Sequence, residues 1–330
     1  MKALYSFFAV IILISLAYLG TIANMFTFFG VVLPYIAAVA FIFGVTYRII
    51  KWAKSPVPFN ITTTCGQGKS LPWIKNSKLE SPHTTLGVIG RMALEVLFFR
   101  SLFRNTKMSL KDGPQIVYGE NKWLWLAGLV FHWSFLIVII RHLRFFFEPV
   151  PEFILLIQSL DGIVEIGVPV LYMTGVALIS SVTYLYLRRA LIPQINYISL
   201  ISDYFPLFLI MAITITGGLM RYTSMRVDII KVKELVMGLV NFNPVVPEGI
   251  GAIFFIHLFL ISVLLIYFPM SKLMHMAGVF MSPTRNMKND NRMKRHINPW
   301  NYPVDTHSYE DWEEEFKDVI KASGLPLEKE

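Results

Sequence analysis

Six long apolar stretches set the pattern of the chain, and polar segments separate them. The first begins directly after Lys2, and the second follows within a few residues, so these two form a helical hairpin. A helix needs about 20 apolar residues to cross a bilayer, and each stretch approaches that length. The pattern predicts an all-α, polytopic membrane protein with six transmembrane helices. Their approximate bounds are 3–21, 27–49, 123–147, 163–187, 198–220 and 249–280.

Two polar segments are longer than a connection between neighbouring helices needs to be. The first contains the stretch "TTLGVIGRMALEVLFFRSLF", in which apolar and basic residues alternate as they do in a helix that lies on a surface. No internal repeat is visible. The chain is therefore expected to have four parts, which are an N-terminal transmembrane hairpin, a cytoplasmic segment, a haem-binding transmembrane bundle and a cytoplasmic tail. Their bounds are 1–49, 50–122, 123–281 and 282–330.

The polar tail carries signals for one helix. Ser308 with Asp311 provides an N-cap, and Gly324 provides a stop, so a helix is predicted over 309–322. From Asp305 onward the tail has nine acidic and three basic residues. An acidic helix is repelled by an anionic membrane surface, so its apolar stripe is expected to dock on a soluble subunit. The stripe consists of Tyr309, Trp312, Phe316, Val319 and Ile320.

Composition agrees with a membrane protein. Hydrophobic residues make up 55% of the chain and charged residues 16%, whereas soluble domains average about 45–50% and about 25%. The first span lacks a small-x-small cleavage site, so it is not read as a cleavable signal. The single cysteine, Cys65, excludes an internal disulfide and any cysteine-ligated cluster held by this chain alone.

The basic residues predict the orientation of the chain in the cell membrane. Six spans place both termini on one side, together with residues 50–122, and that side holds 24 of the 30 Lys and Arg residues. Basic loops stay in the cytoplasm. Both termini are therefore predicted to be cytoplasmic. The net charge of +8 then reflects membrane topology, and no nucleic-acid partner is expected.

Histidines are unevenly distributed. Four of the seven lie on the third and sixth spans, ten residues apart at His132 and His142 and eighteen apart at His257 and His275. Histidine inside a membrane span is costly and usually marks a ligand, a proton path or a polar contact. The other three lie in polar segments and are expected to be solvated. They are His83, His296 and His307.

Counting spans makes the third and sixth antiparallel, which pairs His132 with His275 near the cytoplasm and His142 with His257 near the outer face. The separations along straight helices are about 15 and 27 Å. Helix tilt and a kink at Pro269 are expected to absorb the difference. The sequence therefore predicts two facing pairs of imidazoles, one above the other across the membrane.

Two facing imidazoles without carboxylates or thiolates suit a six-coordinate haem iron, whereas zinc or copper requires three or four convergent ligands. The prediction is two haem b groups with His132, His142, His257 and His275 as iron ligands. The alternative is four independent polar contacts between helices. Gly128, Gly217 and Gly218 either let a macrocycle approach the backbone or allow close helix packing.

The ligand spans, "HWSFLIVIIRH" and "HLFLISVLLIYFPMSKLMH", resemble the nitrate reductase gamma-subunit family of dihaem cytochromes b. This resemblance covers spans two to six and implies a haem-binding bundle of four or five helices. The extra first span departs from the five-helix plan of that family. A narrower resemblance covers nearly the whole chain. The stretches "TTCGQGKSLPWIKNSKLESPHTTLGVIGRMALEVLFFRSLFRNTK" and "HINPWNYPVDTHSYEDWEEEF" are similar to the DsrM family, the membrane cytochromes of the electron-transfer complex associated with dissimilatory sulfite reduction.

The resemblance implies an oxidoreductase subunit that links menaquinone to a cytoplasmic iron–sulfur subunit similar to heterodisulfide reductase, in sulfur or sulfate respiration. It also implies a periplasmic multihaem cytochrome, a ferredoxin-like subunit and further membrane subunits as partners. The gamma-subunit family is thought to use a lysine at its quinol site, but "PEFILLIQSLDGIVEIG" has none in the corresponding region. Asp161 and Glu165 are therefore the quinone-site candidates.

Arginines flank the outer histidine of the third span. Arg141 and Arg144 suit haem propionates as charge-assisted partners, or they extend toward the interface as ordinary snorkelling side chains. Arg221 lies at the same face. Other functions stay open, namely a proton-relaying transporter with structural histidines, a plain membrane anchor, or a dihaem cytochrome b of another respiratory reductase. The missing repeat disfavours a transporter, and a reduced-minus-oxidised spectrum separates these functions.

Overall fold

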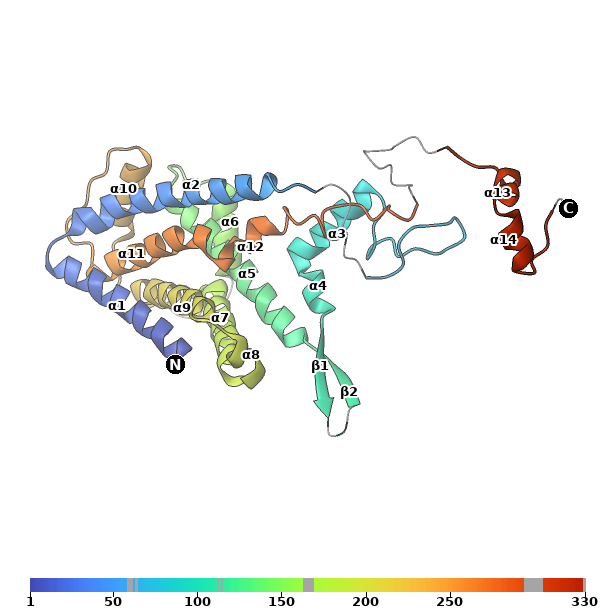
Figure 1. Cartoon of the computed structure of the whole chain (residues 1–330). Helices are drawn as coiled ribbons and strands as arrows, with labels where there is room; N and C mark the ends of the chain where they lie inside the picture. Colours follow the sequence, from blue (N-terminus) through green and yellow to red (C-terminus); the bar gives the residue numbers. More distant parts are fainter. Residues whose placement is uncertain are drawn as a thin grey trace.

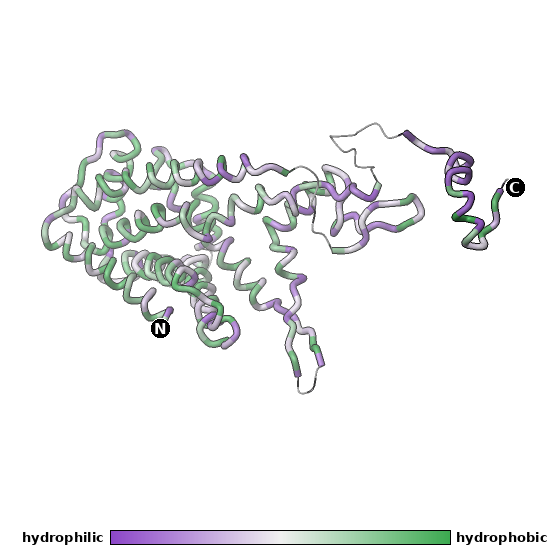
Figure 2. The backbone as a smooth tube through the Cα atoms, in the orientation of Figure 1, coloured by the Kyte–Doolittle hydropathy of each residue, from purple (hydrophilic) through white to green (hydrophobic). Residues whose placement is uncertain are grey.

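The longest helices run together in one apolar bundle (Figures 1 and 2). The computed structural model describes residues 1–57, 62, 65–111, 113, 115–162, 169–293 and 305–328. The bundle helices are α1 (Lys2–Ile22), α2 (Leu33–Ala53), α5 (Lys122–His142), α7 (Met173–Leu191), α9 (Ile201–Tyr222) and α11 (Ala252–Tyr267). Shorter helices connect or follow them, and these are α6 (Glu152–Asp161), α8 (Pro193–Ile198), α10 (Ile229–Val240) and α12 (His275–Gly278).

Helix α11 lies at the centre of the core. It packs against α1, α2 and α9, and its Phe255 and Leu260 side chains are completely buried. The sequence of α11 is apolar on every side, which is the pattern of a helix surrounded by other helices. The predicted sixth span therefore becomes the element around which the others assemble.

The remaining bundle helices pack in a row. Helix α5 packs against α7, α7 against α9, and α9 against α11. Within the part of the chain that the structure describes, α5 and α11 are not among the helix pairs that pack extensively against each other. The two helices with membrane histidines are therefore positioned relative to each other through α7 and α9.

Helices α1 and α2 follow each other through a short connection, as the predicted hairpin requires. A π-helical turn at Phe28–Val32 leads into α2, and the ring of Phe29 packs directly on α1. A Cβ atom added at Gly20 would lie only 2.1 Å from Cε2 of Phe29. Glycine at this position therefore lets the turn that precedes α2 approach α1 closely.

Five helices among the described residues are long and apolar enough to cross a membrane. The helical membrane fold is thus confirmed, but the predicted fourth span, 163–187, is not among the five. Helix α7 occupies that place and begins only at Met173, and residues 163–168 lie outside the described part. Six crossings therefore stay a prediction. The five are Lys2–Ile22, Phe28–Ala53, Lys122–Phe145, Ile201–Tyr222 and Ala252–Met270.

The sixth span, 249–280, was expected to kink at Pro269, and the structure interrupts the α-helix at this point. The α-helix ends at Tyr267, and two 3₁₀ turns follow at Phe268–Met270 and Lys272–Met274. The ring of Pro269 has no N–H and cannot continue the helical hydrogen bonds. It is buried against α2, where a Cβ atom at Gly44 would lie 2.6 Å from Cβ of Pro269.

The helix predicted within "TTLGVIGRMALEVLFFRSLF" is confirmed, although it is broken once. It forms α3 (Thr85–Phe98) and α4 (Arg100–Phe103). The hydroxyl of Thr84 caps α3 by accepting a hydrogen bond from the Gly87 N–H, at 3.1 Å. Phe99 lies between the two helices in the left-handed region, with φ at 51°, and this residue redirects the chain toward α5.

A β-hairpin departs from the all-α prediction. Strands β1 (Thr106–Lys111) and β2 (Gln115–Glu120) pair antiparallel between α4 and α5. The register places Met108 opposite Tyr118 and Leu110 opposite Ile116. These four apolar side chains share one face of the hairpin and are all exposed.

The predicted tail helix is confirmed at its start and interrupted near its middle. The Ser308 hydroxyl accepts a hydrogen bond from the Asp311 N–H, and the Asp311 carboxylate accepts one from the Ser308 N–H, each at 3.1 Å. Two helices, α13 (Tyr309–Glu315) and α14 (Lys317–Ala322), meet at Phe316. The rings of Tyr309, Trp312 and Phe316 are exposed and follow one another along the predicted stripe, but Ile320 is buried.

A half-buried carboxylate ties the polar segment to α4. The Glu80 side chain pairs with Arg100 and Arg104. Partial burial acts to raise the pKa of Glu80, but the two guanidinium groups outweigh it and hold the pKa below its ordinary value of 4.5. The fold thus favours the ionised carboxylate, so the ion pairs stabilise it above this ordinary value and are lost as pH falls through the lowered pKa.

We expect acidification from above to below pH 4.5 to lower the hydrogen-exchange protection of the peptides that contain Glu80 and α4, measured relative to the intrinsic exchange rate at each pH. Glu80→Gln should exchange faster than wild type at the higher pH, because its amide cannot form the ion pairs. The variant should also change less on acidification. An acid-induced loss of protection of equal size in the variant would assign the pH response to other groups.

Candidate functional site

The predicted inner pair comes together. The rings of His132, on α5, and His275, at the start of α12, have centroids 5.9 Å apart and planes at 83°. The ring of Phe99 meets His132 edge-on with a centroid distance of 4.9 Å. The left-handed break at the end of α3 therefore delivers an aromatic side chain to the inner pair.

The predicted outer pair is also formed by neighbouring side chains. His142 lies at the end of α5, and His257 lies on α11, and the two rings are near enough to interact electrostatically. His257 is buried, with 8% of its surface exposed, whereas His142 is exposed. The structure therefore brings the rings of His132 and His275 into contact and places His142 within electrostatic range of His257, in the pairing that the spacing predicted.

All four imidazoles use Nδ1 for a hydrogen bond. The Nδ1 atoms of His132 and His142 lie 2.7 Å from the carbonyl oxygens of Gly128 and Val138, one turn earlier on α5. Nδ1 of His275 lies 3.0 Å from the carbonyl oxygen of Lys272. A carbonyl only accepts hydrogen bonds, so these three Nδ1 atoms carry the proton. The Nε2 lone pair of each ring is then free to bind a metal.

The fourth histidine reaches the same state through another helix. Nδ1 of His257 lies 2.8 Å from the hydroxyl oxygen of Thr216 on α9. The ring also fits closely over Gly217, where an added Cβ atom would lie 3.3 Å from Cε1 of His257. Of the three glycines singled out in the sequence, Gly128 accepts the hydrogen bond of His132 and Gly217 leaves room for the His257 ring, whereas Gly218 has no neighbouring side chain within 4 Å of an added Cβ.

The arrangement fits an iron bound from two sides. Metal–imidazole bonds of about 2 Å on opposite sides place two ring centroids roughly 6 Å apart, and the inner pair has this separation. Among the described residues, no group of three or more His, Cys, Asp or Glu side chains converges as a metal cluster would require. The donor set therefore suits a planar metal cofactor that supplies its other equatorial ligands, and haem is such a group.

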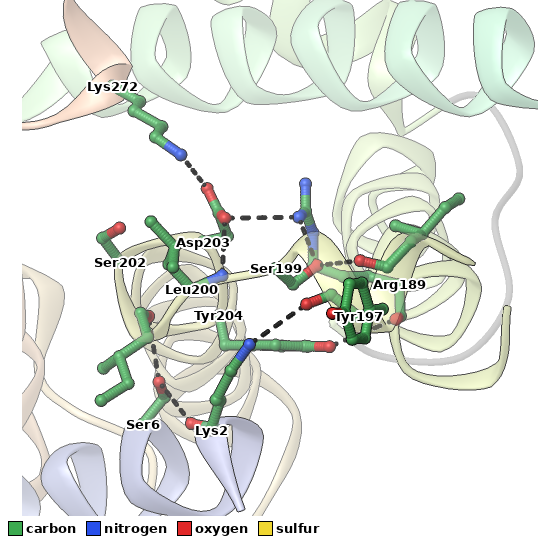
Figure 3. Close-up of polar contacts among 12 residues, drawn as sticks. Lys2, Ser6, Arg189, Tyr197, Ser199, Leu200, Ser202, Asp203, Tyr204 and Lys272 are labelled. Carbon is green, nitrogen blue, oxygen red and sulfur yellow. Dashed lines mark hydrogen bonds and ion pairs between the residues drawn. The ribbon is translucent and has the colours of Figure 1, made fainter. Parts of the chain in front are cut away.

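The inner pair is anchored by a polar network at one end of α9 (Figure 3). The carboxylate of Asp203 accepts hydrogen bonds from Lys272, at 2.6 Å, and from the N–H of Leu200, at 2.9 Å. Arg189, at the end of α7, lies 3.6 Å from the same carboxylate. Because the carbonyl of Lys272 orients His275, the network ties this histidine to α7 and α9.

A second polar network lies beside the outer pair. Asp161 is buried and pairs with Arg141, and its oxygens also accept hydrogen bonds from the N–H and hydroxyl of Thr174, at 2.7 and 2.6 Å. The guanidinium carbons of Arg141 and Arg221 lie 3.6 and 4.0 Å from the ring centroid of Tyr172. This network joins α5, α6, α7 and α9.

The structure thus shows what the other predicted site residues contact. Arg141 binds Asp161, and Arg144 donates a hydrogen bond to the side chain of Gln158 at 2.7 Å. Glu165 lies outside the described residues. Sequence reasoning missed Tyr172, Thr174 and Thr216, because nothing in their local pattern shows which distant side chain they contact.

The sequence pattern described as nitrate reductase gamma subunit matches residues 92–294. This range contains all four paired histidines and more than half of the chain. The chain belongs to the nitrate reductase gamma subunit family. The match begins after α2, so both α1 and α2 lie outside it, whereas the resemblance was expected to include the second span.

Two relatives are similar over most of their length. The chain is 47% identical over 284 residues to a protein of Archaeoglobus fulgidus, covering 84% of each chain. It is 41% identical over 275 residues to a protein of Archaeoglobus profundus, covering 81% of each chain. Both relatives are named Hdr-like menaquinol oxidoreductase cytochrome b-like subunit. These names are consistent with the predicted DsrM-like subunit.

Two neighbouring glycines allow a test of the packing at His257. Alanine favours a helix over glycine by about 1 kcal/mol, so Gly218→Ala should raise the thermal stability of the protein in detergent slightly. Gly217→Ala gains the same propensity but presses on the His257 ring, so it should be less stable than Gly218→Ala. Equal melting temperatures for the two variants would show that the ring yields without cost.

Proposed function

We propose that the chain is a dihaem cytochrome b subunit that passes electrons between menaquinol and a cytoplasmic partner. The carrying observation is that four histidines form two pairs, each ring with Nδ1 hydrogen-bonded and Nε2 left for a metal. His132 and His275 are the proposed axial ligands of an inner haem b, and His142 and His257 those of an outer haem b. The haem groups supply one-electron carriers within the bundle.

The protein's part in this function is to fix the ligands and their surroundings. Helices α7 and α9 position α5 relative to α11, and each axial imidazole is held in one orientation by its Nδ1 acceptor. Arg141 and Arg144 remain the proposed partners of the outer haem propionates. Arg221 is a third cation near them, since it lies one turn beyond Gly217, which borders the His257 ring.

Menaquinone is the proposed substrate, because both relatives are named menaquinol oxidoreductase subunits. The proposed quinone site lies near the outer haem, with Asp161 and Glu165 as candidate proton acceptors. The carboxylate of Asp161 already contacts Arg141 and Thr174, so it would exchange one of these partners to receive a proton. The proposed orientation has both termini in the cytoplasm, so that quinol protons leave outside.

The proposed cytoplasmic partner is an iron–sulfur subunit similar to heterodisulfide reductase. The relatives' names contain "Hdr-like" and "subunit", and the family resemblance adds periplasmic multihaem, ferredoxin-like and membrane partners in sulfur or sulfate respiration. Helices α13 and α14 are the proposed docking element, because their exposed aromatic residues lie among acidic side chains. The exposed face of the β-hairpin is a second surface on the segment before α5.

Ligand replacement tests the haem assignment. His142→Ala and His257→Ala should each remove the same b-type component from the reduced-minus-oxidised spectrum and retain most of the other. His132→Ala and His275→Ala should do the reverse, because each iron would lose one of its two protein ligands. If His132→Ala and His257→Ala removed the same component, the pairing would be wrong. Unchanged spectra in all four variants would contradict haem ligation itself.

Truncation tests the docking element. Removing residues from 304 onward should leave both b-type components unchanged and release the iron–sulfur subunit during purification, because the exposed stripe of α13 and α14 would be lost. Replacing the acidic side chains alone, while keeping the stripe, separates charge from apolar contact. Retention of the iron–sulfur subunit by the truncated chain would shift the assignment to residues 50–122 and their exposed hairpin.

A further inference from the structure

Thr216 gives His257 a hydrogen-bond environment that differs from that of the other three membrane histidines. The acceptors for His132, His142 and His275 are carbonyl oxygens of their own segments, three or four residues earlier. The partner of His257 is a side-chain hydroxyl on α9, forty-one residues away in the sequence. Thr216 and His257 are both buried, with 6% and 8% of their surfaces exposed.

The direction of this hydrogen bond follows from the other contacts of the hydroxyl. Oγ1 of Thr216 lies 2.8 Å from the carbonyl oxygen of Ala212 and 3.0 Å from that of Ile213. A hydroxyl has one hydrogen to donate, and these carbonyls can only accept it. The lone pairs of Oγ1 therefore face Nδ1 of His257 and accept its proton. The reverse arrangement would leave both carbonyls without this donor.

We infer that Thr216 is a positioning residue for the outer ligand: it holds His257 in the Nδ1–H tautomer with Nε2 directed away from α9, and it adjusts how strongly His257 donates electrons to its haem. This inference rests on the proposed function, because it takes His257 as an axial ligand. Gly217 serves the same contact by leaving room for the ring against α9. The outer ligand is thus oriented by a different helix from its own.

The contact has a predictable effect on redox potential. An acceptor on Nδ1–H raises the basicity of an imidazole ligand, and a more basic ligand stabilises the oxidised iron. Removing the acceptor should therefore raise the potential of the haem that His257 binds. Outer-shell partners of metal ligands typically change affinity or activity by 10–100-fold, and a tenfold change in a one-electron equilibrium corresponds to about 59 mV.

The decisive substitution is Thr216→Val, which keeps the branched shape and removes the acceptor. A matched control lies two residues earlier on the same helix. The hydroxyl of Thr214 donates a hydrogen bond to the Ile210 carbonyl at 2.9 Å, and within the described chain it bonds to no histidine. Thr214→Val loses the same kind of hydroxyl without affecting His257. Thr216→Ser restores the hydroxyl and should restore the wild-type potential.

The measurement is a potentiometric titration of both b-type components in the detergent-solubilised wild-type and variant proteins, with the low-temperature EPR signals of the ferric haems. Thr216→Val should raise the potential of the component that His257→Ala removes, by an amount equivalent to about a tenfold change, and should leave the other component unchanged. Thr214→Val should move neither. If Thr216→Val instead loses this haem, retention of the haem by Thr216→Ser and Thr214→Val would also show that the Thr216 hydroxyl positions His257.

Two results would overturn the inference. One is an unchanged potential and EPR signal in Thr216→Val. The other is an equal change in Thr216→Val and Thr214→Val, which would assign the effect to the packing of α9. Failure of the proposed function would look different, since the wild-type protein would then show no b-type components or would keep both in His257→Ala.

Discussion

An imidazole N–H in a membrane span needs an acceptor whether it faces protein or lipid, because the bilayer core holds no water. This requirement explains much of the structure around the four histidines, of which His257 alone is buried by the protein. A buried polar group without a partner costs roughly 1–3 kcal/mol. On α5, the carbonyl one turn earlier meets the need locally, so His132 and His142 require nothing from other helices. His257 instead uses Thr216, which requires α9 to pack closely against α11. The same bond that satisfies the N–H leaves the other nitrogen free for a metal.

The unequal spacing of the histidines imposes a second constraint. Straight helices would place the two histidines of the third span about 15 Å apart and those of the sixth span about 27 Å apart. The sixth span is not one straight helix. Helix α11 ends at Tyr267, and two 3₁₀ turns lead from there to His275. The ring of His275 then lies 5.9 Å from that of His132. The break at Pro269 is therefore part of the site, since it lets both pairs form.

Much of this arrangement was predictable from local pattern. Hydrophobic stretches located the long helices, the Ser308 and Asp311 signal located the tail helix, and histidine spacing identified the two pairs. The hairpin at Thr106–Glu120 also had a visible signal, since apolar residues alternate along both strands on either side of an Asp-Gly pair. The prediction of six spans assigned this region to a polar connection, so the two strands were not predicted.

Other features depend on contacts between distant segments and could not be read from the sequence. Asp161 looked like an available carboxylate, but the fold places Arg141 and Thr174 against it. Pro269 itself marks the break after α11, but only the fold shows that the proline ring packs against Gly44 of α2. Thr216 is one of two threonines on α9, and only the packing of α9 on α11 selects it as the partner of His257. In each case the deciding neighbour comes from another helix.

The two polar networks follow from the way the histidine helices are held. Because α5 and α11 are positioned through α7 and α9, small shifts of these intermediate helices would separate both ring pairs. Apolar packing is non-directional, whereas ion pairs with additional hydrogen bonds fix particular atoms. The Arg141–Asp161 network ties α5 to α6, α7 and α9 beside His142, and the Asp203 network ties α7 and α9 to the segment that carries His275. Charged contacts thus hold the register of the ligands at both ends of the bundle, and apolar packing fills the space between.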